Sequence, residues 1–422
     1  MGDERDINFQ STERQKRILP EDSFGDWKWR EALAELMVPL IGSLYRDGVN
    51  LMIYGKSLVN ESPVAIMKAH RFARQSDNNE LSEFETYPMI EYISTLNLHD
   101  CEIDIGEIAV KCPFFDEIKE DQSKIKDYLN KELESVIDVE TVRPDEPKSI
   151  VLYGFGRIGR LLARMMTQTT GPGNYFRIKA IVIRKASDDD IFKRASLLSR
   201  DSVHGPFDGT VRVDEENTSL VVNGNAIKVI YASSPDEVKY ADHNIIDPIV
   251  VDNTGVWRDE DSLSKHLKSG ASKVILTAPA KGDIKNIVFG INDDILNDND
   301  AIISAASCTT NAIVPVLNAI NDEYSIEGGH IETVHAYTND QNLIDNFHKG
   351  DRRGRGAPLN MVITTTGAVK AVAKALPELE GKLTGNAIRV PTPNVSLAIL
   401  SLQLNKEVSV TDVNNYLRTV AF

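Results

Sequence analysis

The stretch IVLYGFGRIGRLLARMM, residues 150–166, constrains the fold more than any other part of the chain. It joins a short apolar run, a glycine-rich turn and an amphipathic run, and this order predicts a strand, a tight turn and a helix. Gly154, Gly156 and Gly159 stand in GxGxxG spacing, which lets the main chain approach a pyrophosphate while the helix N-terminus offers N–H groups to it. The motif is weak by itself, but this strand-to-helix context predicts a dinucleotide-binding domain.

Further apolar runs continue the alternation of strands and helices. We expect a doubly wound sheet, because four runs read as strands (RIKAIVIRK, NAIKVIYA, DPIVVDNTG and KVILTAP) and SLSKHLKSG reads as a helix.

An acidic residue often ends the second strand of an NAD-binding fold, where it meets the ribose, but Arg184 and Lys185 occupy that end here. Two cations suit the 2′-phosphate of NADP. The alternative is that they are solvated charges and that the acidic run 188–190 meets the ribose.

Cys308 follows the apolar run AIISAAS and precedes the helical run TTNAIVPVLNAI. A cysteine at a strand end and helix start lies near unpaired N–H groups, which lower its pKa and favour the thiolate. The hydroxyl-rich neighbours Ser307 and Thr309 suit an anion beside it. A cysteine can also be a small buried apolar residue, but this context favours a nucleophile.

Two polar segments follow this helix. HIETVHAYTND reads as a strand that carries His335 and leads to Thr338 and Asp340, and an irregular basic loop comes next. Such a long loop in a compact domain usually serves an interface or a site. Thr366 and Gly367 then begin another helical run, which is a second candidate for anion binding.

The first third of the chain differs from the rest in charge. Residues 1–148 hold 18 Lys and Arg against 31 Asp and Glu, which accounts for −13 of the formal −16. Residues 1–25 are expected to be poorly ordered. The apolar spacing predicts helices over 27–45, from Ser62-Pro63 onward, over 89–98 and over 118–139. Pro39 should kink or divide the first of these helices. The charged, proline-broken run 140–149 predicts a linker.

Several classes of function are disfavoured. Gly55-Lys56-Ser57 resembles the end of a phosphate-binding loop, but Asn50 stands where that motif needs a glycine. Three cysteines suit neither a disulfide framework nor a zinc site, so no metal is expected and a reducing cytoplasm is the natural compartment. The acidic balance disfavours nucleic acid, and the chain has no apolar run that could span or enter a membrane.

The motifs GFGRIGR, SCTTN, VHAYTNDQ, DRRGRGA, TTTGAVKAV and TGNAIRVPTPNVS occur in one order from about Ser149 onward. In this order they resemble the phosphorylating glyceraldehyde-3-phosphate dehydrogenase family, in a long bacterial form. The resemblance implies a Rossmann-type domain, an α+β catalytic domain with a mixed sheet, NAD or NADP as cofactor, and a homotetramer. The expected domains are a mainly helical extension at 1–145, the cofactor domain at 149–307 and the catalytic domain at 308–422.

The resemblance also implies roles for single residues. Cys308 would attack the aldehyde carbon and pass through a thiohemiacetal and a thioester, with His335 as acid and base. Thr338, Arg353 and Arg389 would bind the phosphate of the substrate. The attacking inorganic phosphate would meet Ser307, Thr309, Thr366 and Gly367. The cofactor contacts would include Thr277 and, in the glycine turn, Phe155, Arg157 and Ile158.

Some positions depart from the family pattern. Ala312 replaces a second cysteine that many relatives have, and Pro206 stands where an arginine is common. The family continues beyond a point equivalent to Phe422 with strands, a cofactor-orienting asparagine and a helix, so the resemblance predicts a complete form about 50–70 residues longer.

The favoured function is the phosphorylating oxidation of glyceraldehyde 3-phosphate. Erythrose-4-phosphate dehydrogenase is the alternative enzyme, although Thr338 and Thr366-Gly367, which that relative tends to lose, are retained here. A protein that keeps the fold for regulation or binding is the alternative outside enzymes.

Overall fold

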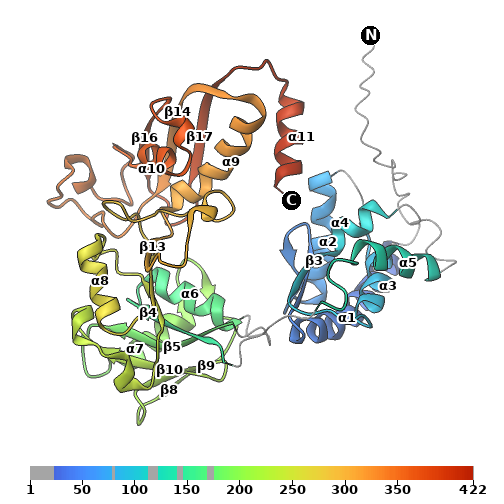
Figure 1. Cartoon of the computed structure of the whole chain (residues 1–422), viewed down its shortest axis with the longest axis horizontal. Helices are drawn as coiled ribbons and strands as arrows, with labels where there is room; N and C mark the ends of the chain where they lie inside the picture. The colour runs from blue at the N-terminus through green and yellow to red at the C-terminus, as the bar shows by residue number, and fades with distance from the viewer. Residues whose placement is uncertain (1–22, 78–80, 113–121, 140–145, 169–174, 422) are drawn as a thin grey trace. The chain divides into compact units, whose positions relative to one another are not determined.

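The computed structural model describes residues 23–77, 81–112, 122–139, 146–168 and 175–421 (Figure 1). Contacts between residues divide it into two compact units. One contains the chain up to Glu146, and the other contains every described helix and strand from Lys148 onward. The predictions for residues 1–22 and for most of the linker lie outside the described residues, while Lys148 and Ser149 already belong to the first strand of the second unit.

The first unit holds helices and a small sheet. The helices are α1 (Ser23–Arg46), α2 (Pro63–Asp77), α3 (Glu83–Ile93), α4 (Ile105–Lys111) and α5 (Gln122–Glu132). The strands β1 (Val49–Ile53), β2 (Lys56–Ser57) and β3 (Cys101–Asp104) form a sheet in the order β2-β1-β3. Sequence patterning predicted helices here but not this sheet, because each strand is five residues or fewer.

Two local predictions in this unit have different outcomes. The α2 start is confirmed, since the Ser62 hydroxyl accepts a hydrogen bond from Ala65 N at 3.2 Å and Pro63 opens the helix. The expectation that Pro39 divides the first helix is wrong, because α1 continues past it as one helix. Its buried stripe, which includes Met37 and Ile41, continues on both sides of the proline and keeps the helix packed.

The turn between β1 and β2 shows why the Gly-Lys-Ser sequence is no phosphate loop. Tyr54 N and Gly55 N donate to the two carboxylate oxygens of Asp104 at 3.0 and 2.7 Å. The main-chain N–H groups that would hold a phosphate are therefore already bound to a carboxylate of the same chain.

The larger sheet of the second unit confirms the doubly wound prediction. Its eight strands lie in the order β13-β12-β11-β4-β5-β10-β9-β8. The parallel strands are β4 (Lys148–Tyr153), β5 (Phe176–Ile183), β10 (Asn225–Tyr231), β11 (Ile249–Asp252), β12 (Lys273–Leu276) and β13 (Ile302–Ser304). β8 (Val211–Asp214) and β9 (Ser219–Val222) add an antiparallel edge. The helices are α6 (Arg157–Gln168), α7 (Asp190–Ser199) and α8 (Glu260–Lys268), and β6 (Arg200–Asp201) pairs with β7 (Gly205–Pro206).

A second, mixed sheet follows along the chain (orange to red in Figure 1). Its order is β15-β16-β14-β17, with β14 (Ile326–Ala336) parallel to β16 (Leu383–Val390) and the other pairs antiparallel. The remaining elements are β15 (Val362–Thr364), β17 (Leu397–Leu404), α9 (Cys308–Tyr324), α10 (Ala368–Ala375) and α11 (Val410–Val420). The register of β14 and β16 pairs His335 with Arg389, which are distant in sequence.

No helix in the described ranges is long and apolar enough to cross a membrane. Within the same ranges, no three His, Cys, Asp or Glu side chains gather in the way that a metal ion requires.

Candidate active site

Cys308 is the first residue of α9, and three residues separate it from the last residue of β13. Ala306 between them has φ +57°, a left-handed conformation that a non-glycine residue rarely adopts, so the chain turns sharply there. Ser307 caps the helix, because its hydroxyl accepts a hydrogen bond from Thr310 N at 3.0 Å. This turn and cap hold an exposed thiol at a helix N-terminus.

The Cys308 thiol faces the imidazole of His335, which lies near the end of β14. Cys308 Sγ is 3.6 Å from His335 Nε2 and 4.0 Å from Thr309 Oγ1. The hydrogen bond with His335 lowers the pKa of Cys308 to about 7, against desolvation, which acts to raise it. The same hydrogen bond raises the pKa of His335, with burial opposing. A thiolate–imidazolium pair is therefore accessible near neutral pH.

The other ring nitrogen of His335 is also held. His335 Nδ1 lies 2.7 Å from Ala336 O and 2.8 Å from Arg389 Nη1, and Arg389 Nη1 also donates to Ala336 O at 3.0 Å. Parallel pairing of β14 with β16 sets Arg389 opposite His335 and so accounts for this contact. The imidazole is thus oriented with Nε2 toward the sulfur.

A second arginine of the site, Arg353, lies in the chain after the end of β14. Arg353 Nη1 binds Asp340 Oδ2 at 3.0 Å, Arg353 Nε donates to Thr364 Oγ1 at 3.0 Å, and the Thr338 hydroxyl donates to Asp340 Oδ1. Burial acts to raise the pKa of Asp340, but the hydrogen bond from Thr338 and the charges of Arg389 and Arg353 lower it on balance. Asp340 was not among the predicted site residues, although its place two residues after Thr338 was the available signal.

The predicted phosphate-binding hydroxyls are at two helix starts. Ser307 and Thr309 are at the start of α9, and Thr366 and Gly367 directly precede α10. Thr366 Oγ1 accepts a hydrogen bond from Ala368 N at 3.1 Å, so it acts as a local cap. The buried faces of α9 and α10 share one apolar core. That shared core fixes the two helices against each other.

The glycine turn after β4 fits the pyrophosphate of a dinucleotide. Gly154 has φ +92°, and a Cβ on it would lie 2.9 Å from Thr254 Cγ2. A Cβ on Gly159 would lie only 2.4 Å from Gly154 O, so the helix and turn approach each other too closely for any side chain. Gly156 faces open space, with no heavy atom within 4 Å of its ideal Cβ. The turn follows β4, which lies between β5 and β11 in the sheet, at the point where the order of the parallel strands reverses.

The other predicted cofactor residues differ in their surroundings. The Phe155 side chain is in the core, Arg157 is half-buried, and Ile158 is exposed. Thr277, just after β12, donates from its hydroxyl to Asp252 O at 3.1 Å and to Asn253 Oδ1 at 3.2 Å. Asp252, Asn253 and Thr254 were missed in the sequence, although the polar run DNTG directly after a buried strand is a signal for a site.

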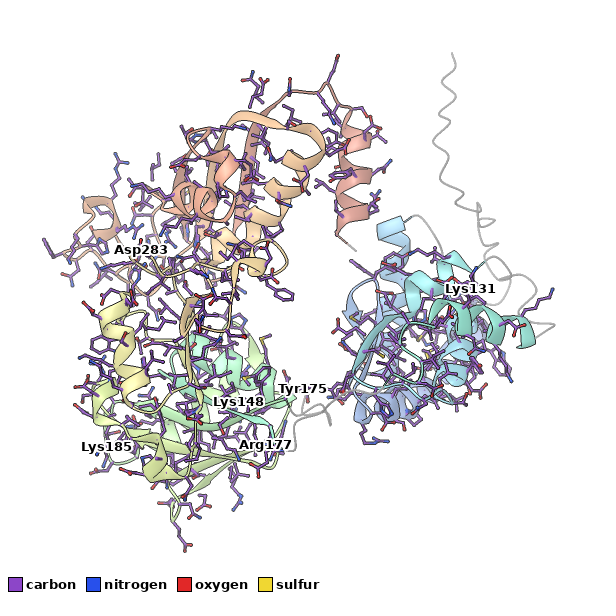
Figure 2. All side chains as sticks on the ribbon, in the orientation of Figure 1. Lys131, Lys148, Tyr175, Arg177, Lys185 and Asp283 are labelled. Carbon is purple, nitrogen blue, oxygen red and sulfur yellow. The ribbon has the colours of Figure 1, made fainter. Side chains whose placement is uncertain are left out.

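Arg184 and Lys185 follow the last residue of β5, and both are exposed. Figure 2 shows Lys185 at the surface of the second unit. Lys185 Nζ pairs with Asp188 Oδ1 at 3.2 Å, whereas no ion pair of Arg184 occurs among the described residues. Cations therefore stand where the ribose of a dinucleotide is expected.

Comparison with known proteins agrees with this geometry. Residues 148–260 match the glyceraldehyde 3-phosphate dehydrogenase NAD binding domain, and residues 307–421 match the C-terminal domain of the same enzyme. A glyceraldehyde-3-phosphate dehydrogenase from Priestia megaterium is 43% identical over 273 residues, which cover 64% of this chain and 78% of the relative. The chain belongs to the glyceraldehyde-3-phosphate dehydrogenase family. It is an oxidoreductase that uses NAD or NADP, as the sequence predicted.

Two other relatives of this dehydrogenase family differ in what they cover. Glyceraldehyde-3-phosphate dehydrogenase 1 of Bacillus subtilis is 43% identical over 271 residues, 64% of this chain and 77% of the relative. A glyceraldehyde-3-phosphate dehydrogenase-like protein of Pseudomonas aeruginosa is 56% identical over 389 residues, 91% of this chain and 84% of the relative. That alignment is longer than the segment 149–422, so it extends into the first unit. Most of the extension is therefore shared with that relative.

Proposed function

We propose that this chain catalyses the phosphorylating oxidation of glyceraldehyde 3-phosphate to 1,3-bisphosphoglycerate. The distance of 3.6 Å between Cys308 Sγ and His335 Nε2 carries the proposal, because it joins a nucleophile to a base in an exposed site. Arginines beside this pair supply the charge that a phosphorylated aldehyde requires, since guanidinium binds phosphate through paired donors.

In the first half of the reaction, His335 Nε2 takes the thiol proton and Cys308 Sγ bonds to the aldehyde carbon. The alkoxide oxygen that forms is stabilised by the Cys308 N–H and the imidazolium, which then protonates it to give the thiohemiacetal. NAD(P) bound at the glycine turn would supply the hydride acceptor. His335 takes the hydroxyl proton as the hydride leaves the carbon and the carbonyl re-forms, which leaves an acyl thioester on Cys308.

In the second half, an oxygen of inorganic phosphate attacks the thioester carbon. The carbon–sulfur bond breaks, the electron pair returns to Cys308, and the acyl phosphate is released. Ser307, Thr309, Thr366 and Gly367 are the proposed contacts for the attacking phosphate. Thr338, Arg353 and Arg389 are the proposed contacts for the phosphate of the aldehyde.

Steady-state assays with two aldehydes test this proposal. Glyceraldehyde 3-phosphate should give a higher kcat/KM than erythrose 4-phosphate, and without inorganic phosphate the reaction should stop after about one turnover per thiol, because the thioester accumulates. A preference for the tetrose would assign the chain to erythrose-4-phosphate dehydrogenase. Absence of turnover with either aldehyde, in a protein that still binds dinucleotide, would favour a regulatory or binding role.

The choice of cofactor is part of the proposal, and the exposed Arg184 and Lys185 support NADP or use of both dinucleotides. Arg184→Ala should lower kcat/KM for NADP about tenfold, a loss of about 1.4 kcal/mol, and leave that for NAD nearly unchanged. Lys193→Ala is a matched control, because this exposed cation on nearby α7 pairs with Asp189, the residue before that helix. Wild-type enzyme with a strong NAD preference that Arg184→Ala does not alter would contradict the assignment.

The proposed setting of the enzyme is a homotetramer in a reducing cytoplasm. The low cysteine content, three residues in the whole chain, supports the reducing compartment. The division into an extension at 1–145, a cofactor domain at 149–307 and a catalytic domain at 308–422 belongs to the same proposal. Size-exclusion chromatography with light scattering would measure the oligomeric state, and a monomeric mass would contradict the tetramer.

A further inference from the structure

A buried acid–histidine pair lies behind the glycine turn. Asp252, the last residue of β11, and His266, in the last turn of α8, have no solvent-exposed surface. His266 Nε2 lies 3.1 Å from Asp252 Oδ2. Burial of a carboxylate costs free energy unless its oxygens are hydrogen-bonded or paired. This fully buried contact is therefore not an ordinary surface ion pair.

The second oxygen of Asp252 holds the loop after β11. Asp252 Oδ1 accepts hydrogen bonds from Thr254 N at 2.8 Å and from the Thr254 hydroxyl at 2.6 Å. With His266 on Oδ2, the carboxylate ties α8 to this loop through both of its oxygens.

Thr254 in turn borders the turn that fits the pyrophosphate. Thr254 Cγ2 and Thr254 N lie 2.9 and 3.2 Å from the ideal Cβ of Gly154. On the same loop, Asn253 N donates to Tyr153 O at 2.8 Å, at the end of the strand that leads into Gly154. The loop therefore sets one wall of the glycine turn.

His266 is placed for this one polar contact. Its ring packs edge-on against Tyr153, with centroids 4.7 Å apart and an interplanar angle of 76°. Its Nδ1 is buried and has no hydrogen-bond partner among the described residues. Within those residues, the imidazole acts on its surroundings through Asp252.

We propose that Asp252 and His266 are positioning residues for dinucleotide binding, which act through Thr254 on the Gly154 turn and do not touch the cofactor. The contacts run from α8 through His266, Asp252 and Thr254 to Gly154. Without the pair, the loop is less restrained and the turn widens. The main-chain N–H groups of the turn then bind the pyrophosphate more weakly.

The test measures dinucleotide dissociation constants by calorimetry on the full chain. His266→Phe keeps the ring against Tyr153 but removes the donor to Asp252, and it should raise the Kd for NAD and NADP alike by about tenfold or more. His266→Gln can present an amide N–H near the former Nε2 position and should recover most of the affinity. The rate of Cys308 alkylation by iodoacetamide without cofactor should stay at the wild-type value in both variants.

Leu263→Ala is the matched control for stability. Leu263 is fully buried on the same helix and packs in the apolar core, so its truncation leaves a cavity without removing a polar contact to Asp252. The control should lower the melting temperature and leave both dissociation constants within about twofold of wild type.

Thr254→Val is a second variant if His266→Phe fails to fold. It keeps the methyl against Gly154, removes the hydroxyl that bonds Asp252, and should raise both dissociation constants several-fold. Unchanged affinity in a folded His266→Phe or Thr254→Val protein would overturn the proposal. An equal loss of affinity in Leu263→Ala would also overturn it, because affinity would then follow stability alone.

Discussion

His335 and His266 each face an acidic group, yet their surroundings differ. His335 is half-buried beside an exposed thiol, at 3.6 Å, and its second nitrogen meets both an arginine and a carbonyl oxygen. His266 is fully buried, 3.1 Å from a carboxylate that is itself fully buried. The open pair can exchange protons with substrate and solvent, whereas the enclosed pair can hold a loop in place. Burial decides which of the two roles an imidazole performs.

The largest expected effect removes the nucleophile from the exposed pair. Cys308→Ser should reduce kcat by about 10⁵-fold or more, because a serine hydroxyl stays protonated where the thiol ionises. Dinucleotide affinity should remain at the wild-type value, since in our proposal it depends on the other histidine. Stopped-flow and calorimetric measurements on one preparation would check both statements, and residual turnover above about 1% of wild type would contradict the assigned nucleophile.

A smaller effect is expected when the base is replaced. His335→Gln should lower kcat by about 10²–10⁴-fold. The His335 hydrogen bond lowers the pKa of Cys308 to about 7, so its loss should move the pKa upward, toward the ordinary value of about 8.5. The midpoint of the pH profile for iodoacetamide alkylation reports this shift directly. His266→Phe supplies the contrast, because its alkylation midpoint should stay near 7.

The smallest effect concerns the glycine turn beside the buried pair. In Gly159→Ala the added Cβ would lie 2.4 Å from Gly154 O, so the main chain must shift and the free energy of unfolding should fall by about 1–3 kcal/mol. Gly156→Ala has open space at its Cβ and should change that free energy by less than about 0.5 kcal/mol.

The same two variants separate stability from binding. Gly156→Ala should still weaken dinucleotide binding, by about tenfold, because its methyl would fill the space that the pyrophosphate needs. Thermal melts and titration of both proteins would test this. Wild-type affinity in Gly156→Ala would show that the cofactor does not approach this residue.

The sequence predicted those parts of the site that depend on local patterning. The glycine turn follows from residue spacing, and the place of Cys308 at a helix start follows from a change of periodicity. The hairpin β8–β9 was missed because its strands have four residues each and polar residues between them. Short strands give too few positions for a period of two to stand out.

The tertiary contacts of the site were beyond sequence reasoning. His266 is 14 residues from Asp252 in the chain, and only the packing of α8 on the sheet brings the two side chains together. Asp340 is 13 residues from Arg353, and an irregular loop joins them. In both cases three-dimensional packing determines which residue is the partner, and residue spacing in the sequence does not predict it.

The parallel pairing of β14 with β16 has a consequence for how this protein can change in length. His335 and Arg389 are opposite each other in that register, and neighbouring residues on a strand point to opposite faces. Insertion or deletion of one residue inside either strand would turn one of the two side chains to the wrong face. The segment that joins the strands also contains β15 and α10, but its residues 343–349 are irregular and mostly exposed and carry no such restriction. Length variation among functional homologues should therefore concentrate in this irregular stretch and avoid the two strands.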